Sequence, residues 1–128
     1  MALQVLYEND LTRHQAGDIL TRRLSQEVRD DGSREEIRRM VAGVIERLGD
    51  IDVILQRSAP AWPLSQMPGV DKAALRLAIF EAIFDNSAAP VKVVISEAVE
   101  LARAFGSESS AKFVTGVMGT VTAREGPR

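Results

Sequence analysis

Apolar residues recur at steps of three and four positions along nearly the whole chain, which is the spacing of one face of an α-helix. The clearest run covers residues 37–48, where the apolar positions are Ile37, Met40, Val41, Val44, Ile45 and Leu48. No segment joins two alternating apolar and polar runs through an Asn-Gly or Asp-Gly turn, the pattern typical of a β-hairpin. This periodicity predicts an all-α protein.

Cap and turn residues divide the pattern into separate helices. With approximate bounds, we expect helices over residues 1–8, 16–28, 33–57, 70–85 and 91–105, and a last helix that carries Val121 and precedes a polar tail over 124–128. Ser33 and Glu36 form a capping-box pattern at the third start. Gly49-Asp50 either interrupts or bends that helix, and Ser109 or Ser110 is expected to cap the last one.

A proline-rich connector separates the two halves of the chain. Pro60, Pro63 and Pro68 fall within nine positions, and proline both lacks a backbone donor and disfavours helix in the residue before it. Trp62 stands in the middle of this connector. Because a tryptophan buries a large apolar area, we expect it to be a plug between two helix layers rather than a platform for a ligand.

Residues 70–85 are apolar on nearly every side of the expected helix, which predicts a central helix with neighbours all round. Asp71 and Lys72 stand in its first turn, and Arg76 and Glu81 interrupt its apolar body. A charge in such a helix must be paired or must reach a surface groove. Arg76 is therefore expected either to contact a ligand or to pair with Glu81 or a helix terminus.

Two further helices carry features beyond the apolar pattern. The helix over 91–105 has a charged outer face that includes Glu100 and Arg103, one turn apart. The last helix contains Gly116 and Gly119, each of which costs roughly 1 kcal/mol relative to alanine. We expect these glycines to allow close approach of another backbone or of a ligand.

Composition narrows the function further. The 128 residues contain 16 Lys and Arg, 18 Asp and Glu, one His and no Cys, and this length is typical of one domain spanning 1–128. Without cysteine there is no disulfide scaffold, thiolate metal site or cysteine nucleophile, and no phosphate-binding or dinucleotide-binding glycine motif occurs. His14 is expected to be a solvated loop residue. We therefore expect a binding protein without enzymatic activity, cofactor or metal.

Charge and hydropathy indicate where such a protein works. The net charge of -2 argues against nucleic-acid binding by bulk electrostatics, but it permits a small local basic patch. No apolar run approaches the ~20 residues that a membrane span needs. We expect a cytoplasmic protein without a membrane partner.

Four motifs in register resemble the NusB family of transcription antitermination factors. They are ALQVLY at 2–7, VDKAALRLAIFE at 70–81, PVKVVISEAVELA at 90–102 and KFVTGVM at 112–118. The resemblance implies two small helical bundles packed across one another. It also implies a non-enzymatic factor that binds boxA RNA together with NusE, a small-subunit ribosomal protein, and helps RNA polymerase pass terminators during ribosomal RNA transcription.

The same resemblance implies site residues. For RNA these are Gln4, Arg76, Lys112 and Phe113, and for NusE they are Tyr7 and Asp71. Single-stranded bases stack on aromatic faces while Lys and Arg hold phosphates, which suits Phe113 and Lys112. Phe113 and Tyr7 are equally compatible with core positions, and Asp71 with a helix-dipole or capping role.

Two departures from the family pattern leave alternatives open. The family has an arginine-rich stretch directly ahead of ALQxLY that this sequence lacks; either the start was assigned too late or the main phosphate clamp is missing, which would weaken RNA binding and its salt dependence. Thr115 replaces the usual Asn, which puts a direct RNA contact there in doubt. The alternatives are a protein-interaction bundle, including a homodimer, without RNA binding, and the NusB-like domain of a ribosomal RNA cytosine methyltransferase.

Overall fold

The computed structural model describes residues 1–12, 15–27, 30–85 and 89–125, and every regular element among them is helical. The α-helices are α1 (Ala2–Thr12), α2 (Ala16–Glu27), α3 (Asp31–Glu46), α4 (Leu48–Ser58), α5 (Gly69–Ile79), α6 (Val91–Phe105) and α7 (Glu108–Glu125). A short 3-10 helix, η1 (Leu64–Gln66), precedes α5, and a π-helix, η2 (Phe80–Phe84), continues it. The prediction of an all-α chain is confirmed for these residues, whereas His14 and Val28 lie outside them.

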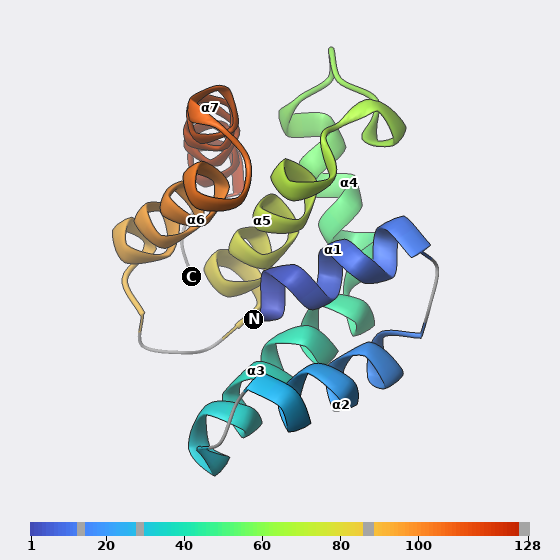
Figure 1. Cartoon of the computed structure of the whole chain (residues 1–128). Helices are drawn as coiled ribbons and strands as arrows, with labels where there is room; N and C mark the ends of the chain where they lie inside the picture. Colours follow the sequence, from blue (N-terminus) through green and yellow to red (C-terminus); the bar gives the residue numbers. More distant parts are fainter. Residues whose placement is uncertain (13–14, 28–29, 86–88, 126–128) are drawn as a thin grey trace.

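Helix α5 is the centre of the molecule (Figure 1). It contacts α1, α3, α4, α6 and α7, as its apolar surface predicted. Helices α1, α2 and α3 pack on one another as one small bundle, and α4 to α7 form the second, with α1 lying against α5 where the bundles meet. The fully buried side chains include Val5, Leu55, Leu75 and Met118, so one continuous core joins the two bundles.

Helix α1 is longer than the sequence predicted. Asn9 and Asp10 continue the helix to Thr12, whose hydroxyl donates to the Glu8 carbonyl at 2.7 Å. Tertiary ion pairs hold this extension: Glu8 binds Arg22 of α2, and Asp10 binds Lys72 of α5 at 2.9 Å. Because these contacts stabilise helical backbone at residues with turn propensity, the expected end at residue 8 is wrong.

Both predicted N-caps are displaced. Asp30 rather than Ser33 caps α3, since its carboxylate accepts the Ser33 backbone N–H at 2.8 Å. In the same way the Ser107 hydroxyl accepts the Ser110 N–H at 3.2 Å, so α7 begins two to three residues earlier than expected. In each case a stronger or earlier cap residue precedes the one that the pattern favoured.

Two further boundaries differ from prediction. The long third helix is interrupted at Arg47, two residues before Gly49-Asp50, and this break separates α3 from α4. Arg124 and Glu125 belong to α7 and not to a tail, because Glu125 pairs with Arg57 and Arg124 donates to the Arg57 carbonyl at 2.9 Å. In the described part of the chain, no helix combines the length and the apolar character that crossing a membrane requires.

Candidate nucleic-acid and partner interface

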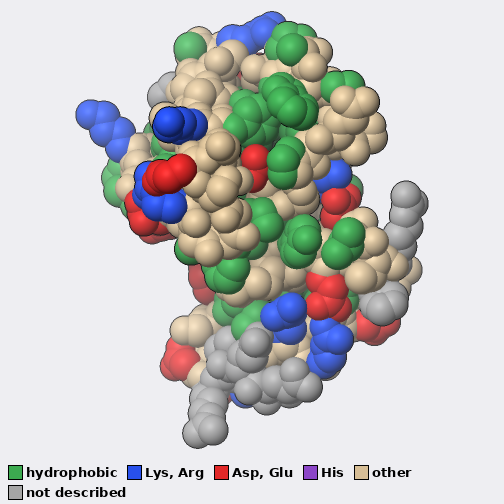
Figure 2. Space-filling view, turned by 45° about the horizontal axis from the view of Figure 1, so that its top comes forward, with side chains coloured by type: hydrophobic (Ala, Val, Ile, Leu, Met, Phe, Trp, Pro, Cys, Tyr) green, Lys and Arg blue, Asp and Glu red, His purple; other side chains and the backbone are tan. Residues whose placement is uncertain are grey.

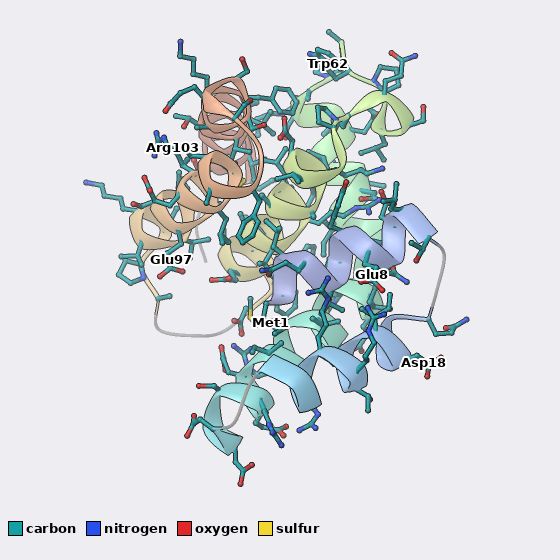
Figure 3. All side chains as sticks on the ribbon, viewed as in Figure 1. Met1, Glu8, Asp18, Trp62, Glu97 and Arg103 are labelled. Carbon is teal, nitrogen blue, oxygen red and sulfur yellow. The ribbon has the colours of Figure 1, made fainter. Side chains whose placement is uncertain are left out.

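The connector between α4 and α5 brings Trp62 onto the surface beside α7. The Trp62 ring meets the Phe113 ring edge-on, with centroids 5.9 Å apart and planes at 66°. Trp62 is 46% exposed, at the end of the molecule where α4 ends (Figure 3). The expectation of a buried plug is therefore wrong, because Phe113 covers only part of the indole.

Gln56 of α4 fixes the conformation of this connector. Its side-chain amide donates to the Trp62 carbonyl at 2.7 Å, and its amide oxygen accepts the Leu64 N–H at 3.0 Å. A single side chain thus satisfies backbone groups on both sides of Pro63, which itself has no N–H. The exposed indole is held by an ordered loop, so it presents a preorganised surface.

Two grooves share the Trp62–Phe113 pair as a wall, and each has a volume of about 350 Å³. We call the first the acidic groove, because Asp71 is the only charged residue among the described residues lining it, which are Trp62, Pro68, Asp71, Gly106, Ser107, Ser109, Ser110 and Phe113. We call the second the cationic groove, because Lys112 is the only charged one among Ser58, Ala59, Trp62, Lys112, Phe113, Gly116, Val117 and Thr120. The surface around the aromatic pair is divided by charge.

Figure 2 shows hydrophobic side chains gathered in the upper half of the face turned toward the viewer, with acidic and basic side chains among and around them. Phe113 is half-buried and packs partly on the core, whereas Lys112 beside it is exposed. Both interpretations of Phe113, as core residue and as surface residue, therefore hold in part.

Asp71 is a buried carboxylate with an unused acceptor. It is 3% exposed, and its Oδ1 atom has no hydrogen-bond partner. It does not cap α5. The N-cap residue of this helix is Pro68, and no side-chain hydrogen bond caps the helix there. A buried acceptor without a donor costs about 1–3 kcal/mol. A donor supplied by a partner in the acidic groove would remove this cost.

Tyr7 lies against the start of α5. A Cβ atom on Gly69 would come within 2.4 Å of the Tyr7 ring, so the two helices approach closely only because residue 69 is glycine. The ring is half-buried and contributes to packing. Gln4, one turn earlier on α1, is also half-buried, and its Oε1 atom has no partner.

Arg76 is held by carboxylates on two other helices. Its Nε and Nη2 donate to the two Asp52 oxygens, each at 2.9 Å, and its Nη1 donates to Asp10 at 3.3 Å. Burial opposes the charged form, but the hydrogen bonds and the negative charges of Asp52 and Asp10 together outweigh it and raise the pKa of Arg76. The expected pairing with Glu81 or a helix terminus is wrong, because both actual partners come from elsewhere in the fold.

The glycines of α7 have no close neighbour in the structure. A Cβ at Gly116 or Gly119 would meet nothing within 4 Å, so the expected close approach of another backbone is wrong for the described residues. Gly116 nevertheless lines the cationic groove, and Gly119 does not. Thr115 donates its hydroxyl to the Ala111 carbonyl at 2.8 Å, which satisfies it within the helix.

A second group of charges lies along α6 and at the start of α7. Arg103 of α6 pairs with Glu100 and Glu108, and Figure 3 shows Arg103 and Glu97 along α6. Burial, together with the nearby charges of Glu97 and Asp85, raises the pKa of Glu81 to about 7. Within the described ranges, no group of three or more His, Asp or Glu residues has the arrangement of a metal site.

The structure therefore brings together most of the predicted site residues. Phe113 and Asp71 both line the acidic groove, and Lys112 lies beside Phe113 in the cationic groove. Tyr7 lies against Gly69, at the same end of α5 as Asp71. Arg76 lies five positions from Asp71 and so faces about 140° away on the helix. Ser58 was not predicted to line this surface, and Trp62 was expected to be buried; the place of Trp62 in a proline-rich turn was the signal that the sequence offered for its exposure.

Solved structures of known proteins share this fold. The structure superposes on T. maritima NusB with a TM-score of 0.90 and 32% identity, over 98% of this chain and 88% of that one. A solved structure of the antitermination factors NusB and NusE in complex with dsRNA matches with a TM-score of 0.89 and 24% identity, covering 96% and 91% of the two chains. This chain is thus an all-helical protein with the NusB fold.

Sequence comparison gives the family. The NusB family model matches residues 1–123. The transcription antitermination protein NusB of Chloroflexus aggregans is 50% identical over 124 residues, which cover 96% of this chain and 83% of that protein. The chain belongs to the NusB family of transcription antitermination proteins, which are not enzymes.

Proposed function

We propose that this protein binds boxA-type RNA and NusE on the surface around the Trp62–Phe113 pair, and that it acts in this way on RNA polymerase during ribosomal RNA transcription. The solved complex of NusB and NusE with RNA supports this combination of partners. Work at transcribing RNA polymerase implies a cytoplasmic location. The partly exposed aromatic pair beside Lys112 carries the proposal.

The RNA component is argued from the aromatic pair. Unstacked bases gain about 1–3 kcal/mol each on an aromatic side chain, and the partly exposed rings of Trp62 and Phe113 offer such a surface. Exposed Lys112 supplies a phosphate contact next to it. Gln4 fits less well, because its side-chain oxygen is buried and would have to become exposed before it could accept a bond from RNA. Arg76 fits least well, since RNA would have to replace its two carboxylate partners.

The NusE component is argued from Asp71 and Tyr7. The free Asp71 oxygen in the acidic groove suits a Lys, Arg or backbone N–H donor, which a basic ribosomal protein offers. Tyr7 adjoins the same turn of α5 through Gly69. Charged hydrogen bonds across an interface contribute more than neutral ones, so this carboxylate is the anchor that we assign to NusE.

The RNA proposal is tested by fluorescence anisotropy of a labelled boxA-type RNA, titrated with the protein at two salt concentrations, with and without purified NusE. Lys112→Ala should weaken binding severalfold and lower the log-log salt slope by about 0.7, the contribution of one single-strand phosphate contact. Lys92→Ala is the matched control, because Lys92 is exposed at the far end of α6, about 20 Å along the helix from Phe105. Equal slopes for both variants would contradict the assignment of Lys112.

The NusE proposal is tested with Asp71→Asn. This change keeps the shape of the side chain and removes the charge, so it should weaken NusE binding at least about tenfold, as expected for a charged hydrogen bond. The free energy of unfolding should stay the same or rise by about 1 kcal/mol, because a neutral amide costs less to bury than a carboxylate that lacks a donor. Calorimetric titration with NusE and urea unfolding measure the two quantities. Unchanged NusE affinity would place the interface elsewhere.

A further inference from the structure

The cationic groove contains a second buried polar group without a partner. Ser58, the last residue of α4, is only 8% exposed, and its hydroxyl oxygen makes no hydrogen bond. A buried hydroxyl without a partner calls for an explanation, because such groups are normally satisfied by protein or by a bound molecule. This residue lines the groove, so a ligand in the groove could supply the missing partner.

Gly116 of α7 also lines the groove. A Cβ at this position would meet no atom within 4 Å, so the glycine leaves open space in front of the helix backbone. Glycine weakens a helix interior by roughly a factor of five in the folding equilibrium relative to alanine. The groove volume of about 350 Å³ falls at the lower end of small-molecule sites.

The aromatic pair completes a site for a flat ring. In an edge-on pair, the ring that presents its edge keeps both of its own faces uncovered by its partner. Trp62 and Phe113 are arranged in this way, with planes at 66°. Lys112 gives the groove a positive charge, and no acidic residue is among the described residues that line it. This charge favours a phosphate-bearing ligand over the basic partner that suits the acidic groove.

We propose that the cationic groove is a nucleobase subsite. One unpaired base of the RNA enters between Ser58 and Gly116 and packs on the Trp62–Phe113 pair. The polar edge of the base exchanges a hydrogen bond with the Ser58 hydroxyl, and the phosphate next to it lies at Lys112. This inference rests on the proposed RNA-binding function and assigns a residue outside the predicted site, Ser58, to the reading of a base.

Trp62 makes the subsite directly observable, because it is the only tryptophan in the chain. A base stacked on the indole should quench its emission. We would saturate the protein with NusE, add a labelled boxA-type RNA, and record RNA anisotropy and the emission change on RNA addition in the same titration. Trp62→Phe is the blank that removes the signal of the protein itself.

Gly116→Leu and Gly119→Leu form a matched pair of variants. Both glycines lie on α7 with nothing within 4 Å, but only Gly116 lines the groove. Gly116→Leu should abolish the quenching and weaken RNA binding about 5- to 150-fold, the range for one stacked base. Gly119→Leu should bind and quench as the wild type does. Circular dichroism checks that both variants are folded.

A second test does not depend on filling the groove. Ser58→Ala should weaken binding of the intact RNA about 2- to 12-fold, as expected for one hydrogen bond. A scan with single abasic nucleotides should find one position at which quenching is lost, and at that position Ser58→Ala should have no further effect. An equal effect of Ser58→Ala on every abasic RNA would overturn the assignment of the hydroxyl.

The outcomes separate this inference from the function on which it rests. A rise in anisotropy with unchanged Trp62 emission, and equal affinity for the two glycine variants, would overturn the subsite and leave RNA binding in place. Quenching by NusE alone, with Gly116→Leu weakening NusE binding, would assign the groove to the protein partner and likewise overturn the subsite. No rise in anisotropy for the wild type would overturn both.

Discussion

Replacement of Arg76 by methionine distinguishes a structural role of this side chain in the central helix from a role in RNA binding. The change keeps an unbranched apolar stem and removes the guanidinium that joins α5 to Asp52 of α4 and Asp10 of α1. The side chain of Arg76 is 12% exposed, and those of Asp52 and Asp10 are 22% and 30% exposed. The variant therefore leaves one carboxylate, that of Asp52, without its bidentate partner, while Asp10 keeps Lys72.

The magnitude follows from this burial. Breaking a fully buried pair by removing one partner costs about 3–5 kcal/mol, and an exposed pair contributes about 0–1 kcal/mol. Because water reaches both carboxylates in part, we expect Arg76→Met to lower the free energy of unfolding by about 2–3 kcal/mol. This is a large share of the 5–15 kcal/mol typical of a domain. Asp52→Asn combined with Arg76→Met should give a coupling energy of about 1–2 kcal/mol.

Urea unfolding of the single and double variants measures these quantities, and Arg38→Met is the control. Arg38 is half-exposed and approaches Glu35 only at 3.8 Å, so its loss should cost less than about 0.5 kcal/mol. A loss at Arg76 no greater than at Arg38 would refute the structural role. RNA anisotropy, measured well below the melting temperature, tests whether Arg76 contacts RNA. Unchanged RNA affinity of the variant would exclude Arg76 from the RNA surface. A fall in RNA affinity at unchanged stability would assign Arg76 to that surface.

Two further predictions concern stability. Gly43→Ala should lower the free energy of unfolding by about 1–2 kcal/mol, because the new Cβ would lie 2.1 Å from the buried Phe80 ring and overpacking outweighs the gain in helix propensity. The new Cβ of Gly49→Ala would meet open space, so this change should instead raise the free energy of unfolding by up to about 1 kcal/mol. Urea midpoints of the two variants that shift in the same direction would contradict the close contact between residue 43 and the Phe80 ring. Burial raises the pKa of Glu81 from 4.5 to about 7, so its ionisation destabilises the fold as pH rises through this window. Glu81→Gln should therefore raise the free energy of unfolding by about 1–2 kcal/mol at pH 8, after allowance for solvent screening, and should leave it unchanged near pH 4. Urea unfolding at the two pH values measures this difference. A gain in stability that does not depend on pH would exclude the ionisation of Glu81 as its cause.

The existence and order of the helices could be predicted from the sequence because helix periodicity is a local property. The central position of α5 followed from its apolar surface, and the NusB motifs indicate the family through residue identity and spacing alone. The boundaries were less accurate. Asp30 and Ser33 are both good caps within four residues, and a choice between such neighbours depends on where the helix packs rather than on propensity.

The partners of the charged residues depended on tertiary structure. Arg76 is 24 positions from Asp52 and 66 from Asp10, so no local pattern could pair them. Likewise, the meeting of Trp62 with Phe113 and the burial of Asp71 beside both require α5, α7 and the proline connector to be packed together. The sequence alone determined which residues form helices and which family they belong to, since both are properties of spacing and identity. Only the tertiary structure decided which polar groups are paired and which remain free to bind a partner, because pairing is a contact between distant segments.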